Sequence, residues 1–336
     1  MAGAFLAAAA VASAASSGVS ILPREDDRRV DVMVDGKPFT SYIYPATLKK
    51  PVLYPLLTEA GKPVTRGFPM DPRPGERVDH PHHVGLWFNF GDVNGVDFWN
   101  NSGGEGSEKM GTIVHRAVRN ARAGSSQADL DVLLEWLMPD GHAVLREEAR
   151  FSFIARPKVR IVDRAARLTA LAERVVFRDN KEGLLGLRVA RALEHPSTKP
   201  EVFTDAKGKP TTVARLDNTG VTGRYLTSEG KVGEEVWGTR GRWCALQGRV
   251  DGKDVTLAIL DHPRNPGHPT YWHARGYGLF AANPLGQKVF SNGAQELNLT
   301  LEPGASATFL YRIVILSESA KKEAIDALYD DFTKGR

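Results

Sequence analysis

The chain has 336 residues, of which 42% are hydrophobic and 25% charged, a composition typical of a soluble globular protein. Its 44 basic and 40 acidic residues leave a net charge of +4 with no lysine- or arginine-rich block, which argues against nucleic acid as a partner. The single cysteine, Cys244, excludes an internal disulfide, and its apolar neighbours favour a buried hydrophobic role over a nucleophilic one.

The first 17 residues resemble the apolar part of a secretory signal. Ala12-Ser13-Ala14 fits the small-x-small cleavage pattern, but the positive charge that normally precedes the apolar part is missing. A secreted or periplasmic location and a cytoplasmic one therefore both stay open. No other segment approaches the ~18 apolar residues of a membrane-spanning helix, so we expect no membrane span.

Most of the remaining chain has the pattern of β-strands. Residues 30–34 and 39–44 flank Asp35-Gly36, a frequent hairpin turn pair. In residues 86–90, apolar side chains alternate with Trp87 and Asn89, the period of a half-buried strand. Segments 101–109 and 197–212 are rich in loop-forming residues. Further strands are expected at 129–136, 144–155, 159–171, 173–178, 184–190, 243–250, 255–260 and 305–316.

Only the C-terminus is predicted to be helical, because Ile325, Leu328 and Phe332 form one apolar stripe at helical spacing. Many strands, one helix and no alternation of strand with helix predict an all-β fold, a large antiparallel β-sandwich. No linker divides the chain, so residues 28–336 are expected to form a single domain.

Three histidines lie within four residues, at His80, His82 and His83. Histidine is suited to proton transfer near neutral pH and is a common metal ligand. In an extended segment, residues two apart face the same side, so His80 and His82 could converge on a metal such as zinc. A single loop histidine usually only bonds to the backbone, but three so close together favour a functional role.

A second group, Asp261-His262-Pro263, repeats Asp79-His80-Pro81 and is followed by His268 and His273. Its prolines make the segment rigid, which suits a loop that presents a site at the end of a sandwich. The alternative is a loop with a purely structural role. We expect the two groups to meet in one site, with His80, His82 and His262 as possible ligands of a divalent metal.

Glu182 and Arg188 flank a predicted strand between the two histidine groups. Glu182 could supply a carboxylate, and Arg188 would need an anionic partner if it faces inward. Aromatic faces beside polar side chains suit sugar rings, whose C–H faces stack while their hydroxyls bond. The candidate sugar-binding residues are Trp99, Asp97, Asn94, Trp272 and Tyr277.

Several functional motifs are missing from the sequence. It has no GxSxG nucleophile motif, no P-loop, no Rossmann fingerprint after a strand and no His-Glu-x-x-His zinc motif. A nucleotide-dependent enzyme is therefore not expected.

The segments 64–69, 79–88, 91–99, 181–183 and 268–273 together resemble a bacterial family labelled methane oxygenase PmoA-like. The resemblance covers most of the chain after residue 30 and implies a role in carbohydrate metabolism, the context in which the family's genes are often found. It does not imply methane oxidation, because the membrane subunit of methane monooxygenase needs several spanning helices.

The leading hypothesis is an enzyme that acts on a carbohydrate or glycoside as a lyase, epimerase or hydrolase, on a sandwich of the galactose-mutarotase type. His82 or His83 would be base or metal ligand, and His268 or His273 would be the acid or the completing ligand, with Glu182 as a spare carboxylate. Arg188 would neutralise oxyanion charge, and a divalent metal could polarise a carbonyl. The alternatives are a non-catalytic carbohydrate-binding module and a metal-dependent oxygenase. The substrate would be a small molecule or glycan, and the oligomeric state is open.

Overall fold

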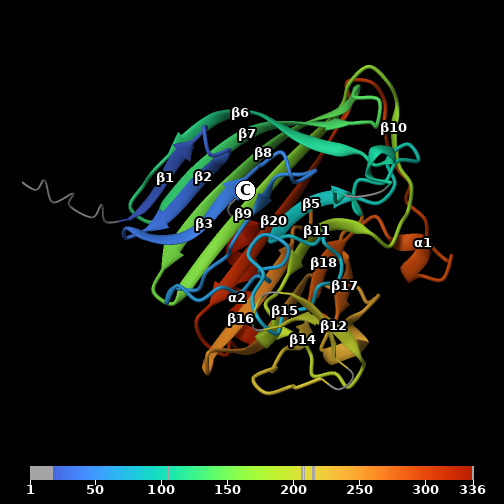
Figure 1. Ribbon diagram of the computed structural model, residues 1–336. Coiled ribbons are helices and arrows are strands. Elements are labelled where there is room, and N and C mark those ends of the chain that lie inside the picture. Colours follow the sequence, from blue (N-terminus) through green and yellow to red (C-terminus); the bar gives the residue numbers. More distant parts are fainter. Residues whose placement is uncertain (1–17, 104–105, 206, 208, 214–215, 335–336) are drawn as a thin grey trace, which may run out of the picture.

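The computed structural model describes residues 18–103, 106–205, 207, 209–213 and 216–334, and the predicted leader lies outside them. Two eight-stranded antiparallel sheets pack face to face, with the long strands of one sheet running behind the shorter strands of the other (Figure 1). This confirms the predicted large antiparallel β-sandwich. No helix of the described residues is long and apolar enough to cross a membrane.

The first sheet carries the residues on which the functional argument rests. Its centre joins β5, β11 and β18, which come from three distant parts of the chain. In spatial order its strands are β1 (Val19–Arg24), β2 (Arg29–Val34), β3 (Lys37–Ile43), β4 (Val52–Leu53), β5 (Leu86–Phe90), β11 (Gly183–Arg188), β18 (Leu279–Asn283) and β17 (Tyr271–Arg275).

The second sheet contains the longest strands and forms the opposite layer. In spatial order its strands are β14 (Arg224–Thr227), β15 (Trp243–Val250), β16 (Lys253–Asp261), β20 (Ser306–Leu316), β9 (Val159–Ala170), β8 (Ala143–Arg156), β7 (Gln127–Leu137) and β6 (Thr112–Arg122). Two small ribbons pair β10 (Val175–Phe177) with β19 (Leu299–Leu301) and β12 (Glu201–Thr204) with β13 (Pro210–Val213).

The helices lie outside the two sheets. The predicted C-terminal helix is α2 (Lys322–Lys334), and α1 (Gln287–Phe290) is a single turn. Helix α2 covers the outer face of the second sheet with Ile325, Tyr329 and Phe332, which are buried. Short 3₁₀ helices span Ser107–Lys109, Arg191–Leu193 and Gly233–Val236.

The main core lies between the sheets, and the alternation in β5 decides what faces it. Leu86, Phe88 and Phe90 belong to this core, whereas Trp87 packs on the outer face of the first sheet. This is the half-buried strand that the sequence predicts, because neighbouring residues of a strand face opposite sides.

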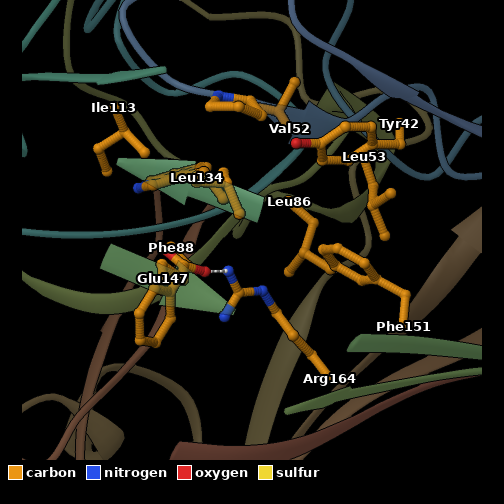
Figure 2. A pocket seen from close by; sticks show the side chains of 12 residues that line it. Tyr42, Val52, Leu53, Leu86, Phe88, Ile113, Leu134, Glu147, Phe151 and Arg164 are labelled. Atoms are coloured by element: carbon orange, nitrogen blue, oxygen red, sulfur yellow. Dashed lines mark hydrogen bonds and ion pairs between the residues drawn. The ribbon is translucent and has the colours of Figure 1, made fainter. Parts of the chain in front are cut away.

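The core also contains one buried ion pair beside a small cavity (Figure 2). Glu147 bonds to Arg164 and accepts a hydrogen bond of 2.9 Å from Nε1 of Trp136, and the Arg164 guanidinium lies 4.1 Å from the ring centre of Phe88. The cavity measures about 20 Å³, which is room for one water molecule. It therefore belongs to the packing of the core and is too small for a sugar.

Candidate functional site

Strand pairing sets four residues in a row across the outer face of the first sheet, and the last of them, His273, lines the candidate site. Gly186 pairs with Trp87 on one side and with Ala281 on the other, and Ala281 pairs with His273. A side chain at Gly186 would place its Cβ 2.4 Å from the Trp87 ring, so the indole lies directly against this glycine. Trp87 and Ala281 belong to one buried apolar cluster on this face.

A cavity of about 250 Å³ is present on this outer face. It brings the first histidine group together with His273, although β17 lies far from this group in the sequence. Four of the nine histidines line it. The lining residues are His80, His82, His83, Trp99, Asn100, Lys181, Glu182, Trp237, His273, Arg275 and Tyr277.

His83 is held in one tautomer by Arg188. Nη1 of Arg188 lies 3.1 Å from Nδ1 of His83, and because a guanidinium can only donate, Nδ1 accepts and the ring proton is on Nε2. The ring stacks between Trp87, at 5.0 Å between centres, and His80, at 4.8 Å. Burial, reinforced by His82 and Arg188, lowers the pKa of His83 well below its usual value. His83 is thus a neutral imidazole with an Nε2–H donor.

Asp79 is the anionic partner that the buried Arg188 requires. Its Oδ1 accepts hydrogen bonds from Arg188 at 2.6 Å and from Arg66 at 2.7 Å, and its Oδ2 lies 2.6 Å from Nδ1 of His80. Burial raises the pKa of Asp79, but the His80 bond and the two guanidinium charges outweigh it and hold the pKa well below the usual range. Arg66 also donates to the carbonyls of His80 and His83 and so fixes the loop.

His82 and His273 are also neutral at pH 7. Burial, followed by the charge of Lys50, lowers the pKa of His82 to about 2. Burial, followed by Lys181 and Arg275, lowers the pKa of His273 to about 3. Nε2 of His82, Nε2 of His83 and Nδ1 of His273 are buried and have no hydrogen-bond partner among the described residues. Buried polar atoms are normally paired, so three such nitrogens at one cavity indicate a place for a polar ligand.

The carboxylate of Glu182 lies at the cavity. Its Oε2 lies 3.8 Å from Nδ1 of His273, and its Oε1 forms an ion pair with Lys181. The close approach of Gly91, whose N–H donates to the Glu182 carbonyl at 2.8 Å, positions the segment before β11. A carboxylate and an imidazole therefore stand next to each other at the cavity.

Two predicted members of the site, His268 and His262, do not reach it. His268 bonds through Nδ1 to the buried Asp261 at 2.8 Å, and Asp261 also accepts from Asn265 and from the Thr270 backbone. The His262 ring packs edge-on against Phe332 of α2, on the far side of the sandwich. The part of the loop after β16 that contains His262 and His268 is therefore held by hydrogen bonds to the buried Asp261 and lies outside the cavity.

The metal set His80, His82 and His262 is consequently wrong, because His262 lies across the sandwich from the other two. Among the described residues no group of three or more His, Cys, Asp or Glu side chains has an arrangement that could hold a metal ion.

Of the five residues predicted to contact a sugar, two line the cavity and three do not. Trp99 and Tyr277 line the cavity. Trp272 is buried in the core between the sheets, because it alternates with His273 on β17 and faces the opposite side. Asn94 is occupied with the backbone of β10, accepting from Val176 at 2.8 Å. Asp97 does not line the cavity but closes a turn, and it accepts from the backbone N–H of Trp99 at 2.7 Å.

Sequence reasoning missed Arg275, Trp237, Lys181, Asn100 and the nearby Lys50. Arg275 could have been found, since it is two residues after His273 on the same strand and faces the same side. Trp237 follows a 3₁₀ helix and gave no periodic signal. Lys50 is buried and donates to Asn101 at 2.7 Å; burial lowers its pKa to about 7.

The structure thus defines an all-β sandwich with a small polar cavity of imidazoles, one carboxylate and aromatic rings on the outer face of one sheet. The chain belongs to DUF6807, a family of unknown function, whose model matches residues 29–330. This corrects the resemblance to the PmoA-like family, because the matching family is a different one. No curated protein matches the sequence.

Solved structures with similar architecture include three sugar enzymes or their domains. The galactosidase domain of the alpha-galactosidase-sucrose kinase AgaSK is 8% identical with a TM-score of 0.42, covering 89% of this chain and 42% of its own. The alpha-galactosidase AgaB from Geobacillus stearothermophilus is 9% identical with a TM-score of 0.41, covering 88% and 40%. Galactose 1-epimerase from Lactobacillus acidophilus NCFM is 12% identical with a TM-score of 0.39, covering 90% and 100%. The chain spans about two fifths of the length of the two galactosidase structures, and at these scores none of the three assigns an activity to it.

Proposed function

We propose that this protein is an enzyme that binds a sugar in the cavity on the first sheet and moves a proton to and from it. One observation carries the proposal: three buried imidazole nitrogens without partners, on His82, His83 and His273, occur at one cavity with the carboxylate of Glu182. A polar ligand that fills this cavity would satisfy them, and the hydroxyls of a sugar both donate and accept.

The electrostatics divide the roles between the side chains. An imidazole whose pKa is far below 7 is a weak base, but its N–H remains a good donor to an oxygen that gains charge. His83, with its proton on Nε2, is therefore the group that polarises a sugar oxygen. Glu182 is the base, and the neutral imidazole of His273, whose Nδ1 lies 3.8 Å from this carboxylate, is available to bond to the sugar beside it.

The composition of the lining favours an epimerase or lyase over a hydrolase. Glycoside hydrolysis normally uses a pair of carboxylates on either side of the scissile bond. Glu182 is the one carboxylate among the described residues that line the cavity. Removal and return of a proton at carbon needs one base and one oxygen-polarising donor, and the cavity offers both.

The aromatic side chains suit the apolar faces of a sugar ring. Trp237 is 40% exposed although it is a large apolar side chain, and Tyr277 lines the same cavity. A non-catalytic carbohydrate-binding module would use the same rings, and it is the second candidate. Under that alternative, sugar binds without any proton transfer.

Incorporation of solvent deuterium into sugars separates the two candidates. A panel of neutral and acidic monosaccharides and short glycans is incubated with the protein in D₂O, and loss of individual C–H signals is followed by proton NMR. We expect exchange at one carbon of one sugar class, abolished in Glu182→Gln and strongly reduced in His273→Asn. The control is His142→Asn, an exposed surface histidine whose removal should leave exchange unchanged.

Exchange that persists in Glu182→Gln would contradict the assignment of the base. Binding of a sugar without exchange at any carbon would favour the binding module.

A further inference from the structure

We infer that the sugar bound in this cavity carries a carboxylate and that Arg275 recognises it. The inference rests on the proposed function and narrows its substrate class to acidic sugars such as uronic acids. Its basis is the arrangement around Arg275, which lacks the anionic partner that Arg66, Arg188 and Lys181 each have.

Arg275 is a cation without a counter-ion. It lies at the end of β17, lines the cavity, and also lines a neighbouring cavity of about 540 Å³ on its other side. No acidic side chain of the described residues comes within ion-pair distance of its guanidinium, and none of them accepts a hydrogen bond from it. Its one contact of note is Trp237, whose ring centre is 5.2 Å from the guanidinium carbon.

The other cations near the cavity are engaged by groups of the protein. Lys50 donates to the side chain of Asn101 at 2.7 Å, and the rest have anionic partners. Arg66 and Arg188 share Asp79, at 2.7 and 2.6 Å, and Lys181 pairs with Glu182. Arg275 is therefore the cation whose charge is available to a ligand.

The geometry of the stacked guanidinium suits a carboxylate. The guanidinium carbon of Arg275 lies over the Trp237 ring, and a guanidinium whose N–H groups have no protein acceptor can bind both oxygens of one carboxylate. Because Trp237 limits the movement of Arg275, less conformational freedom is lost when the carboxylate binds.

The charge of the lining favours an anion as well. His82, His83 and His273 are neutral, and the two cationic lining residues Lys181 and Arg275 outnumber Glu182, the one carboxylate among the described lining residues. Lys181 is already engaged by Glu182, so the excess is concentrated at Arg275, on the wall shared by the two cavities. A neutral sugar would leave this charge unused, whereas a carboxylate neutralises it.

The test compares the affinities of acidic and neutral sugars of the same ring configuration. Galacturonate and galactose, and glucuronate and glucose, are titrated into the wild-type protein and into Arg275→Met, with calorimetry or NMR as the readout. We expect wild type to bind one of the uronates at least about tenfold more tightly than its neutral partner. In Arg275→Met this preference should fall to about twofold or less, while affinity for the neutral sugar stays within about threefold, since one charge-assisted pair accounts for the difference. Arg275→Lys should recover part of the preference, because the charge remains but the paired donors are lost.

Arg242→Met is the matched control. Arg242 also packs on an aromatic ring, at 5.3 Å from Tyr329, but it lies beside α2 and away from the cavity. It should bind the uronate as wild type does. Equal affinity of wild type for acidic and neutral sugars, or an equal loss of both in Arg275→Met, overturns this inference and leaves the proposed function standing. Failure of wild type to bind any sugar of the panel overturns both.

Discussion

Replacing Asp79 with Asn should destabilise the protein strongly, although the two side chains have nearly the same shape. Asp79 is the shared counter-ion of Arg66 and Arg188, whose side chains are both 0% exposed. The neutral amide would leave two buried guanidinium groups without a full negative charge. It would also replace the charge-assisted bonds of 2.7 and 2.6 Å with weaker ones.

The expected loss follows from the burial of the pair. Removing one partner of a buried ion pair typically costs about 3–5 kcal/mol, because the remaining charge stays desolvated. Burial and the charge of Arg188 already lower the pKa of Arg66 to about 9, so these guanidiniums depend on the carboxylate. We therefore expect the free energy of unfolding to fall by about 3–5 kcal/mol.

Urea denaturation followed by tryptophan fluorescence measures this loss, with Asp251→Asn as the control. Asp251 pairs with Lys62 at 2.7 Å, but the two side chains are 63% and 47% exposed, and such surface pairs contribute at most about 1 kcal/mol. If Asp79→Asn loses no more unfolding free energy than Asp251→Asn, Asp79 is not the counter-ion on which the buried Arg66 and Arg188 depend.

Three further predictions test the site itself. The usual pKa of histidine is 6.5 and burial lowers that of His273 to about 3, so between these two pH values the unfolded chain binds a proton that the folded protein does not, and stability falls as the pH falls. His273→Gln should therefore reduce the slope of unfolding free energy against pH by about 1.4 kcal/mol per pH unit in this acid range. Urea titrations at several pH values measure this slope. An unchanged slope would show that His273 is protonated in the folded state. Trp237→Ala should weaken sugar binding, measured by calorimetry, and leave stability nearly unchanged. Trp272→Ala should lower the free energy of unfolding by about 3–5 kcal/mol in urea denaturation. A large loss of stability in Trp237→Ala, with sugar binding weakened only in Trp272→Ala, would reverse the two assignments. Gly186→Ala should lower the free energy of unfolding by about 1–3 kcal/mol, because the new methyl group meets the Trp87 ring and this buried ring cannot move away. Gly103→Ala is the control, since its Cβ would meet open space. Equal stability of the two variants would contradict the close packing of Trp87 on Gly186.

The features that sequence predicted well are those with a strict period. The alternation in residues 86–90 placed Phe88 in the core and Trp87 outside, and the apolar stripe through Ile325 and Phe332 gave α2. The irregular segments were less predictable. Segment 197–212, which was expected to be a loop, contains β12 and all but the last residue of β13, because strands of four residues are too short to show a clear apolar alternation.

The candidate site could be predicted only in part, because its members are assembled by sheet pairing. His273 reaches the same cavity as His83 through the pairing of β17 with β18, β11 and β5, a register that no local pattern reveals. The repeat of Asp-His-Pro at 261–263 pointed to a shared role for His262, but the two copies lie on opposite layers of the sandwich. Composition identifies which residues can do chemistry, whereas strand pairing decides which of them meet.

The most direct test of the site is nitrogen-15 NMR of the histidine side chains during a titration with galacturonate at pH 7. The ring nitrogens of His82, His83 and His273 should report neutral imidazoles before sugar is added. Their signals should then shift as their free nitrogens gain partners. The signals of His142 and His268, which lie outside the cavity, should stay unchanged. Charged imidazolium signals from His82, His83 and His273 at pH 7, or sugar-induced shifts at His268 in place of His83 and His273, would contradict a sugar site on the first sheet.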